Sequence, residues 1–247
     1  MKTYGLIGEY LDHSFSKDFF THKFTAEDID ARYENFALAH ISEVESLLKW
    51  DELDGLNVTV PYKVAILTYL DELSEEARKI GAVNTVQFLD GKKIGHNTDA
   101  FGFAQSIKPF LTFQHERAIV LGTGGASKAI SYVLDNLGID VIKISRIPKG
   151  EKQFGYDEVN DNMLRACKLV VNATPVGTFP EIDKCPQFPF EFLTEEHLVI
   201  DLIYNPNKTK FLRHAEENGA VILNGRPMLE HQALKAWEIW NTGLDSV

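Results

Sequence analysis

The sequence is poor in cysteine and has no strongly basic stretch, and both absences exclude whole classes of function. Only Cys167 and Cys185 are cysteines among 247 residues, and they form no C-x-x-C pair. Two thiols are too few for a disulfide scaffold, and their spacing argues against a thiolate zinc site, so we predict no metal. The formal net charge is −11. An acidic chain without a basic stripe argues against nucleic acid as the main partner.

Long apolar runs are also missing. No apolar stretch reaches the roughly 18 residues that a membrane-spanning helix needs. The first ten residues, MKTYGLIGEY, contain no long apolar segment of the kind found in secretory signals. Hydrophobic residues nevertheless make up 44% of the chain, which is enough for real cores. The sequence therefore predicts a cytoplasmic α/β protein with no membrane partner.

Strands and helices alternate along the first hundred residues. Hydrophobic spacing predicts strands at 3–8, 32–38, 55–60, 82–89 and 92–96, and helices at 16–28, 41–50, 64–70 and 74–80. Asp90-Gly91, between the last two strands, is typical of a tight hairpin turn. We expect this part to form an α/β unit of its own with a mixed sheet, followed by a linking helix at 101–111.

The rest of the chain continues the alternation with longer connections. We expect strands at 118–121, 140–145, 169–172, 198–202 and 220–223, helices at 126–137, 209–218 and 227–240, and a proline-rich surface loop at 175–189. Strands alternating with crossover helices predict a parallel, doubly wound sheet. The predicted domains are 1–101, completed by the terminal segment 227–247, and a Rossmann-like domain at 102–226.

A glycine-rich turn stands more than a hundred residues into the chain. The apolar run 118–121 ends in Gly122-Thr123-Gly124-Gly125, and small residues and a helical pattern follow. Strand, glycine turn and helix start together allow backbone N–H groups to approach a pyrophosphate. The motif alone is weak and would also suit a tight structural turn, but the βαβ pattern around it favours a dinucleotide site.

The end of the next predicted strand indicates which dinucleotide is bound. NAD sites place Asp or Glu there to bind the ribose 2′-hydroxyl, whereas this chain has Ser145-Arg146. A guanidinium pairs with a 2′-phosphate, which a carboxylate would repel. Lys149 and Lys152 follow and could add positive charge. An ordinary surface arginine is the alternative, but the pattern favours NADP.

Four polar clusters in the first hundred residues are too concentrated for a purely structural role. They are HSFS at 13–16, NVTVPYK at 57–63, GAVNT at 81–85 and GHNTD at 95–99. Ser14 and Ser16 stand where helix N-caps belong, and two hydroxyls beside free helix N–H groups would also bind a carboxylate.

The remaining clusters offer groups for acid–base chemistry. Asn57 and Thr59 alternate with two valines, so the polar pair should share one face of a strand while Val58 and Val60 face the core. Lys63 follows that strand and could supply a proton, although a solvated surface lysine is the alternative. Asp99 precedes a predicted helix, where a simple N-cap is the alternative.

Together, these motifs resemble those of the shikimate dehydrogenases of the single-function bacterial type. The resemblance extends over nearly the whole chain and is carried by ordered short motifs rather than by one long match. The motifs are S-F-S at 14–16, N-V-T-V-P-Y-K at 57–63, G-A-V-N-T at 81–85, N-T-D at 97–99, G-T-G-G-A at 122–126, N-A-T-P-V-G at 172–177, D-L-I-Y-N-P at 201–206 and N-G-x-x-M-L-x-x-Q-A at 224–233. One departure is Ser145-Arg146-Ile147, where the family often has N-R-T.

The resemblance implies a reaction and a set of substrate residues. The reaction is the reversible, NADPH-dependent reduction of 3-dehydroshikimate to shikimate in the biosynthesis of chorismate and the aromatic amino acids. Lys63 and Asp99 match the catalytic pair; which of them releases the proton is left open. The matching substrate residues are Ser14 and Ser16 for the carboxylate, Thr59, Asn84, Asp99 and Gln232 for the ring hydroxyls, Asn57 as support, and Tyr204 from the cofactor domain.

The resemblance also implies the cofactor residues. The matching positions are Gly122, Thr123, Gly124, Gly125, Ala126, Arg146, Leu202 and Gly225, with Thr174 and Val176 at the nicotinamide edge. Two rival functions stay open: a quinate/shikimate dehydrogenase that uses NAD, and a non-catalytic sensor of shikimate-type ligands. Arg146 argues against the first, and the presence of both Lys63 and Asp99 argues against the second. The sequence leaves open whether the protein is a monomer or a homodimer.

Overall fold

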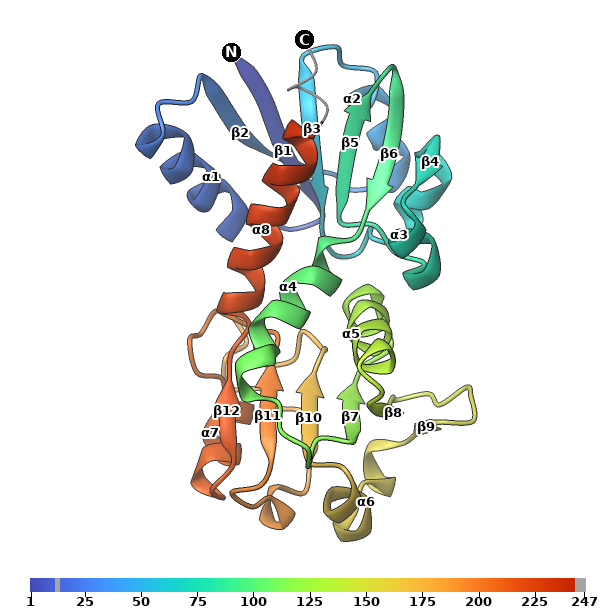
Figure 1. The fold of residues 1–247 in the computed structure, drawn as a ribbon, viewed down its shortest axis with the longest axis vertical. Coiled ribbons are helices and arrows are strands. Elements are labelled where there is room, and N and C mark those ends of the chain that lie inside the picture. The colour runs from blue at the N-terminus through green and yellow to red at the C-terminus, as the bar shows by residue number, and fades with distance from the viewer. Residues whose placement is uncertain (12–13, 243–247) are drawn as a thin grey trace. The chain divides into compact units, whose positions relative to one another are not determined.

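The fold consists of two compact units. A computed structural model describes residues 1–11 and 14–242. One unit contains residues 1–102 and those from Leu229 onward, and the other contains Phe103–Met228. Each has its own six-stranded sheet, and helices pack on those sheets (Figure 1). The predicted α/β class, with one mixed and one parallel sheet, is confirmed.

The first unit is built on the mixed sheet. Its strands are β1 (Lys2–Gly8), β2 (Ala31–Ala37), β3 (Leu53–Val58), β4 (Glu72–Leu73), β5 (Thr85–Leu89) and β6 (Lys92–His96), in the order β2-β1-β3-β5-β6-β4. Strand β1 is parallel to β2 and β3, whereas β5 runs antiparallel to β3 and β6. Asp90 and Gly91 join β5 to β6 with φ values of 50° and 74°. The predicted hairpin is therefore present, with both turn residues in the left-handed region that such turns require.

Helices cover both faces of this sheet. Two short helices, α2 (Val44–Leu47) and α3 (Glu75–Ile80), pack on one face around Ile7 and Leu56. The opposite face carries α1 (Phe15–Ala26) and α8 (Arg226–Asn241), packed around an aromatic cluster. The alternation of buried side chains along β1 explains this arrangement, because Leu6 and Ile7 point to opposite faces.

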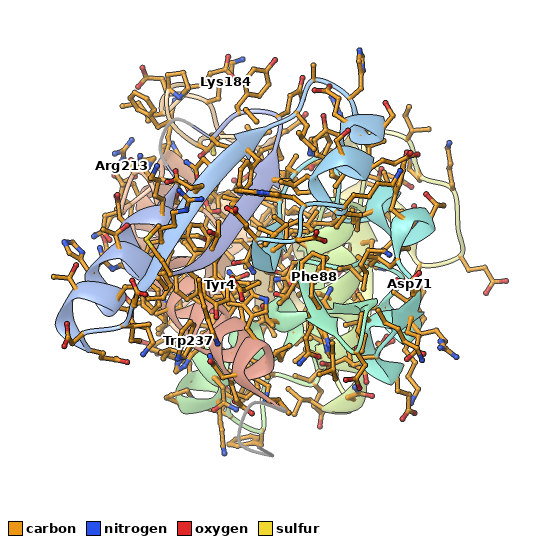
Figure 2. The ribbon with its side chains drawn as sticks, turned by 90° about the horizontal axis from the view of Figure 1, so that it is seen from above. Tyr4, Asp71, Phe88, Lys184, Arg213 and Trp237 are labelled. Carbon is orange, nitrogen blue, oxygen red and sulfur yellow. The ribbon has the colours of Figure 1, made fainter. Side chains whose placement is uncertain are left out.

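The aromatic cluster fixes α8 on the first unit. The Trp240 ring stacks on Tyr4 with 4.8 Å between ring centroids, and its Nε1 donates to the Val86 carbonyl oxygen at 3.0 Å. Trp237, one turn earlier, meets Tyr4 edge-on at 5.4 Å (Figure 2). A Cβ on Gly55 would lie 2.6 Å from Trp240 Nε1, so the indole requires a glycine at this position.

The second unit has a fully parallel sheet. Its strands are β7 (Arg117–Leu121), β8 (Asp140–Ile144), β9 (Gln153–Phe154), β10 (Leu169–Asn172), β11 (Leu198–Asp201) and β12 (Val221–Leu223), in the order β12-β11-β10-β7-β8-β9. Its helices include α5 (Gly125–Asn136), α6 (Asp161–Ala166) and α7 (Lys210–Glu217), while α4 (Thr98–Ile107) contains the boundary between the units. The strand order reverses between β7 and β10. Ligands of such sheets bind beyond the carboxyl ends of the strands at that point.

Some predicted elements are shorter than expected. The helix expected at 41–50 is a 3-10 turn, Ile41–Glu43, followed by α2, and the one expected at 64–70 is a 3-10 helix, Ala65–Tyr69. Helix α6 and the two-residue strands β4 and β9 were not predicted, because each is too short to show a hydrophobic period. Among the described residues, no helix is long and apolar enough to cross a membrane.

The strand that carries the second polar cluster also ends early. Strand β3 stops at Val58, which is buried, while Val60 is 68% exposed. The prediction that both valines face the core was therefore wrong for Val60. Pro61, which follows it, has no N–H to continue the ladder of hydrogen bonds.

Candidate active site

A buried ion pair lies at the centre of the first unit's polar residues. Lys63 follows β3, and Asp99 is the second residue of α4. Lys63 Nζ lies 2.6 Å from Asp99 Oδ2, and the side chains are 14% and 1% exposed. Desolvation makes such charges costly unless they are paired, and here each compensates the other. The lysine is thus held in place with an ammonium group that can donate a proton.

Asn84 holds the other side of this pair. Its Nδ2 lies 3.0 Å from Asp99 Oδ1 and 3.1 Å from Gln232 Oε1. Its Oδ1 accepts a hydrogen bond from the Thr98 backbone N at 2.7 Å. Asn84 is only 3% exposed, so its amide is occupied mainly by the protein itself. The side chain therefore joins Asp99 on α4 to Gln232 on α8 and fixes both.

The interpretation of Asp99 as an N-cap is wrong. Asn97 has that role, because its Oδ1 accepts from the Ala100 backbone N at 3.2 Å. The Asn97 amide also donates to the Ala82 carbonyl oxygen at 2.9 Å, which anchors the start of α4 on the preceding turn. Capping by Asn97 leaves the Asp99 carboxylate for Lys63 and Asn84.

Ser14 and Ser16 lie at the start of α1. Ser14 is the N-cap, and its Oγ accepts from the Lys17 backbone N at 3.3 Å. The capping interpretation of Ser14 is thus confirmed; because that bond uses an oxygen lone pair, the Ser14 hydroxyl proton stays available to an anion. Ser16 contacts Tyr33, and its hydrogen bond opposes the rise in the Tyr33 pKa that burial causes. His13, in the same sequence cluster, lies outside the described residues.

Tyr33 and Asn57 connect Ser16 to the backbone of Asn84. Tyr33 Oη donates to Asn57 Oδ1 at 2.8 Å, and Asn57 Nδ2 donates to the Asn84 carbonyl oxygen at 3.2 Å. The supporting role expected of Asn57 in substrate binding stays a prediction. Thr59 lies just beyond β3, where its backbone N donates to the Ile7 carbonyl oxygen at 2.9 Å. Sequence reasoning missed Tyr33, because a tyrosine on an amphipathic strand is indistinguishable from a core residue.

The glycine turn of the second unit has the conformation that its sequence predicts. Gly122 has a φ of +103°, and an added Cβ would lie 3.1 Å from Thr174 Cγ2. Gly124 is the N-cap of α5 and has no side chain to occupy the helix N-terminus. Nothing lies within 4 Å of a Cβ built on Gly124. The turn therefore fits a pyrophosphate, which needs free backbone N–H groups and room to approach them.

The end of β8 presents one unpaired cation. Arg146 is exposed and forms no ion pair with any residue that the structure describes. Lys152, which was expected to add charge, is instead bonded to Asp140, and that partner raises the Lys152 pKa. Ser145 Oγ lies 3.2 Å from the backbone N of Ile147, so this hydroxyl closes its own turn. The Arg146 guanidinium is thus exposed to solvent, and a group of this kind can form a bidentate contact with a phosphate.

The other predicted cofactor residues follow β10, β11 and β12. A Cβ on Gly225 would overlap the Leu202 carbonyl oxygen, so the two backbones are packed in direct contact. Thr174 lies beyond β10, where its backbone N donates to Asn172 Oδ1 at 3.0 Å. Tyr204 follows β11 in the same unit and stays a predicted substrate contact. The described residues contain no group of three or more His, Cys, Asp or Glu placed to hold a metal ion.

Comparison with known proteins identifies the family. The shikimate dehydrogenase substrate binding domain matches residues 6–86. The NADP(+) shikimate dehydrogenase of Methanosphaera stadtmanae is 33% identical over 254 residues, covering 96% of this chain and 90% of that protein. This chain belongs to the shikimate dehydrogenase family. A relative from Desulforamulus reducens is 36% identical over 263 residues, with 96% and 88% covered.

Solved structures of relatives have the same fold. The shikimate 5-dehydrogenase of Thermus thermophilus, in complex with NADP(H) and shikimate, is 33% identical with a TM-score of 0.87, and the match covers 98% of this chain and 94% of that one. The quinate dehydrogenase of Corynebacterium glutamicum, in complex with NAD, is 30% identical with a TM-score of 0.85 and the same coverage. The shared fold therefore leaves substrate and cofactor preference to individual residues.

Proposed function

We propose that this enzyme reversibly reduces 3-dehydroshikimate to shikimate with NADPH, using Lys63 and Asp99 as its catalytic pair. The observation that carries the proposal is the 2.6 Å contact between Lys63 Nζ and a carboxylate that is almost fully buried. The curated relatives named above are NADP(+) shikimate dehydrogenases, which supports the same reaction class, an NADP-dependent oxidoreductase acting on a CH–OH group.

The pair performs the proton chemistry of the reduction. NADPH, when bound, supplies a hydride to the carbonyl carbon, which leaves negative charge on the oxygen. Lys63 Nζ stabilises that charge and donates the proton that converts the alkoxide to a hydroxyl. Asp99 Oδ2 orients the ammonium, while Asn84 fixes the other carboxylate oxygen at 3.0 Å.

The other polar residues of the first unit bind the substrate in this proposal. Ser14 and Ser16 take the carboxylate, supported by their place at the start of a 12-residue helix. The ring hydroxyls are bound by Thr59, Asn84, Asp99 and Gln232, with Asn57 in support. Tyr204, which belongs to the second unit, stays a further predicted contact. The corresponding domain is 1–101 completed by 227–247.

The second unit holds NADP in this proposal, as domain 102–226. The pyrophosphate lies on the turn from Gly122 to Ala126, and Arg146 pairs with the 2′-phosphate. Thr174, Val176, Leu202 and Gly225 complete the cofactor site. A cytoplasmic location, and a monomeric or homodimeric state, stay predictions.

The decisive assay follows NADPH formation from shikimate by absorbance, beside three parallel reactions: shikimate with NAD, quinate with NADP and quinate with NAD. We expect the highest kcat/KM for shikimate with NADP. Faster turnover of quinate with NAD would replace the proposal by the quinate/shikimate alternative. Binding of shikimate without turnover of either substrate would replace it by the sensor.

Replacing Arg146 by alanine should impair the use of NADP alone. A charge-assisted hydrogen bond contributes about 1.5–3 kcal/mol, so we expect KM for NADP to rise about 10- to 100-fold. KM for NAD should change little, because NAD has no 2′-phosphate. Arg213→Ala is the matched control, since Arg213 is an exposed arginine on α7 (Figure 2). An equal rise in KM for both cofactors in Arg146→Ala would contradict the assignment.

A further inference from the structure

A buried carboxylate ends β11 in the second unit and has no part in the chemistry described above. Asp201 is fully buried. Its Oδ2 accepts from Thr209 Oγ1 at 2.7 Å, and its Oδ1 accepts from the Ile203 backbone N at 3.1 Å and from Asn172 Nδ2 at 3.0 Å. A buried carboxylate is costly unless such donors surround it, so this position needs an explanation.

The carboxylate determines which way the Asn172 amide points. Asn172 is also fully buried, at the end of the neighbouring strand β10. An ionised carboxylate only accepts hydrogen bonds, so Asn172 must turn its Nδ2 toward Asp201 and its Oδ1 away. That oxygen then accepts from both the backbone N and the Oγ1 of Thr174, at 3.0 and 2.7 Å.

The same contacts reach two loops of the proposed cofactor site. Thr174 Oγ1 accepts in turn from the Val176 backbone N at 3.3 Å, so the loop after β10 is held by the amide that Asp201 orients. The bond from the Ile203 backbone N holds the loop after β11, which carries Leu202. Leu202 is itself tied to β10 by its backbone N, which donates to the Asn172 carbonyl oxygen at 3.0 Å.

We propose that Asp201 is a positioning residue for NADP(H), acting through Asn172 on Thr174 and directly on the loop that carries Leu202. The inference rests on the proposed role of the second unit as the cofactor domain. Burial raises the pKa of Asp201 to about 6, while the hydrogen bonds from its three donors lower it. The amide orientation itself is fixed by the contacts of Asn172 with Asp201 on one side and with Thr174 on the other. A purely structural role would stabilise the unit without any selective effect on the cofactor.

The test is a double-mutant cycle of Asp201→Asn and Thr174→Val, read by titrating each variant with NADPH and following the fluorescence of the nicotinamide. Asparagine keeps the size of the side chain but no longer dictates the Asn172 orientation. We expect each single variant to bind NADPH about tenfold more weakly. Losing one hydrogen bond to a charged group has an effect of this size, and the loss of the Thr174 hydroxyl should have a similar one because Asp201 acts through it. Both substitutions weaken the same contact, the one between the Asn172 amide oxygen and Thr174. The double variant should therefore bind NADPH no more weakly than Asp201→Asn alone.

Two comparisons separate positioning from stability. Leu164 belongs to the hydrophobic core of the second unit. Its replacement by alanine should lower the thermal unfolding midpoint and leave the NADPH dissociation constant unchanged. The shikimate dissociation constant should be unchanged in Asp201→Asn. If Asp201→Asn does not fold, Asn172→Ala takes its place in the cycle. This variant removes the side chain that bonds both Asp201 and Thr174.

The outcomes are distinct. Unchanged NADPH affinity in Asp201→Asn, or a double variant weakened by the product of the single effects, overturns the positioning role and leaves the proposed function intact. A wild-type protein that binds no NADPH overturns the proposed function itself. Weakened binding with non-additive effects supports the inference.

Discussion

Replacing Lys63 by alanine should reduce kcat for shikimate oxidation by about 1,000-fold or more, because proton transfer and stabilisation of the alkoxide are lost together. KM for NADP should change little, since the substitution lies in the other unit. The Asp99 carboxylate would lose its partner at 2.6 Å and become an unpaired buried charge. The measurement is steady-state kinetics of NADPH formation, with circular dichroism to verify folding.

Lys92→Ala is the matched control for this prediction. Lys92 is an exposed lysine of the same unit, paired with Glu72 at 2.6 Å on the surface. Such exposed pairs contribute little, so its kcat should equal that of the wild type. Turnover within a factor of about ten of the wild type in a folded Lys63→Ala protein would remove Lys63 from the chemistry, because general acid catalysis alone contributes at least about 100-fold.

Replacing Trp240 by alanine should destabilise the first unit by about 3–5 kcal/mol, the usual effect of truncating a large buried aromatic side chain. The ring is 5% exposed and contacts both Tyr4 and Phe20, with 4.8 and 5.4 Å between ring centroids. The measurement is urea denaturation followed by tryptophan fluorescence. Trp50 and Trp237 stay in the variant and both belong to the first unit, so the signal reports on that unit.

Trp240→Phe separates packing from hydrogen bonding in this position. This variant keeps an aromatic ring but loses the Nε1 donor that bonds the Val86 carbonyl oxygen. It should therefore lower the free energy of unfolding less than the alanine variant does. We expect kcat/KM for shikimate to fall in Trp240→Ala, because α8 also carries Gln232 to Asn84. If Trp240→Ala lowers the free energy of unfolding by less than about 1 kcal/mol, the Trp240 ring does not hold α8 on the first unit.

Sequence patterns predict the elements that have a strong period or a turn signal. The continuous apolar runs of β7 and β10, the Asp90-Gly91 hairpin and the glycine turn at 122–125 are all evident in the amino-acid sequence, and the fold contains each of them. Short elements are not predictable in this way. Helix α6 has only six residues, and its start depends on the Asn160 side chain capping Met163 rather than on a hydrophobic stripe.

The residues of the site can be predicted from the sequence more readily than the contacts between them. Lys63, Asp99, Asn84 and Gln232 are each expected from motifs, yet nothing in the sequence indicates that one asparagine amide joins two of the others. That contact depends on α8 lying against β5, which is a matter of tertiary packing. The capping interpretation of Asp99 is wrong for a related reason, because two neighbouring polar residues compete for the same helix N-terminus and Asn97 occupies it.

The split of the first unit between the two ends of the chain has a consequence for synthesis on the ribosome. The second unit is one continuous segment, Phe103–Met228, and all of it is translated before the last turns of α8. Until those turns emerge, Tyr4 and Phe20 lack the indole that covers them, and Asn84 lacks Gln232. The nascent chain can thus complete the second unit first, while the first unit exposes aromatic surface until α8 has been translated. A premature stop shortly before Gln232 would leave the glycine turn whole and the substrate site unfinished.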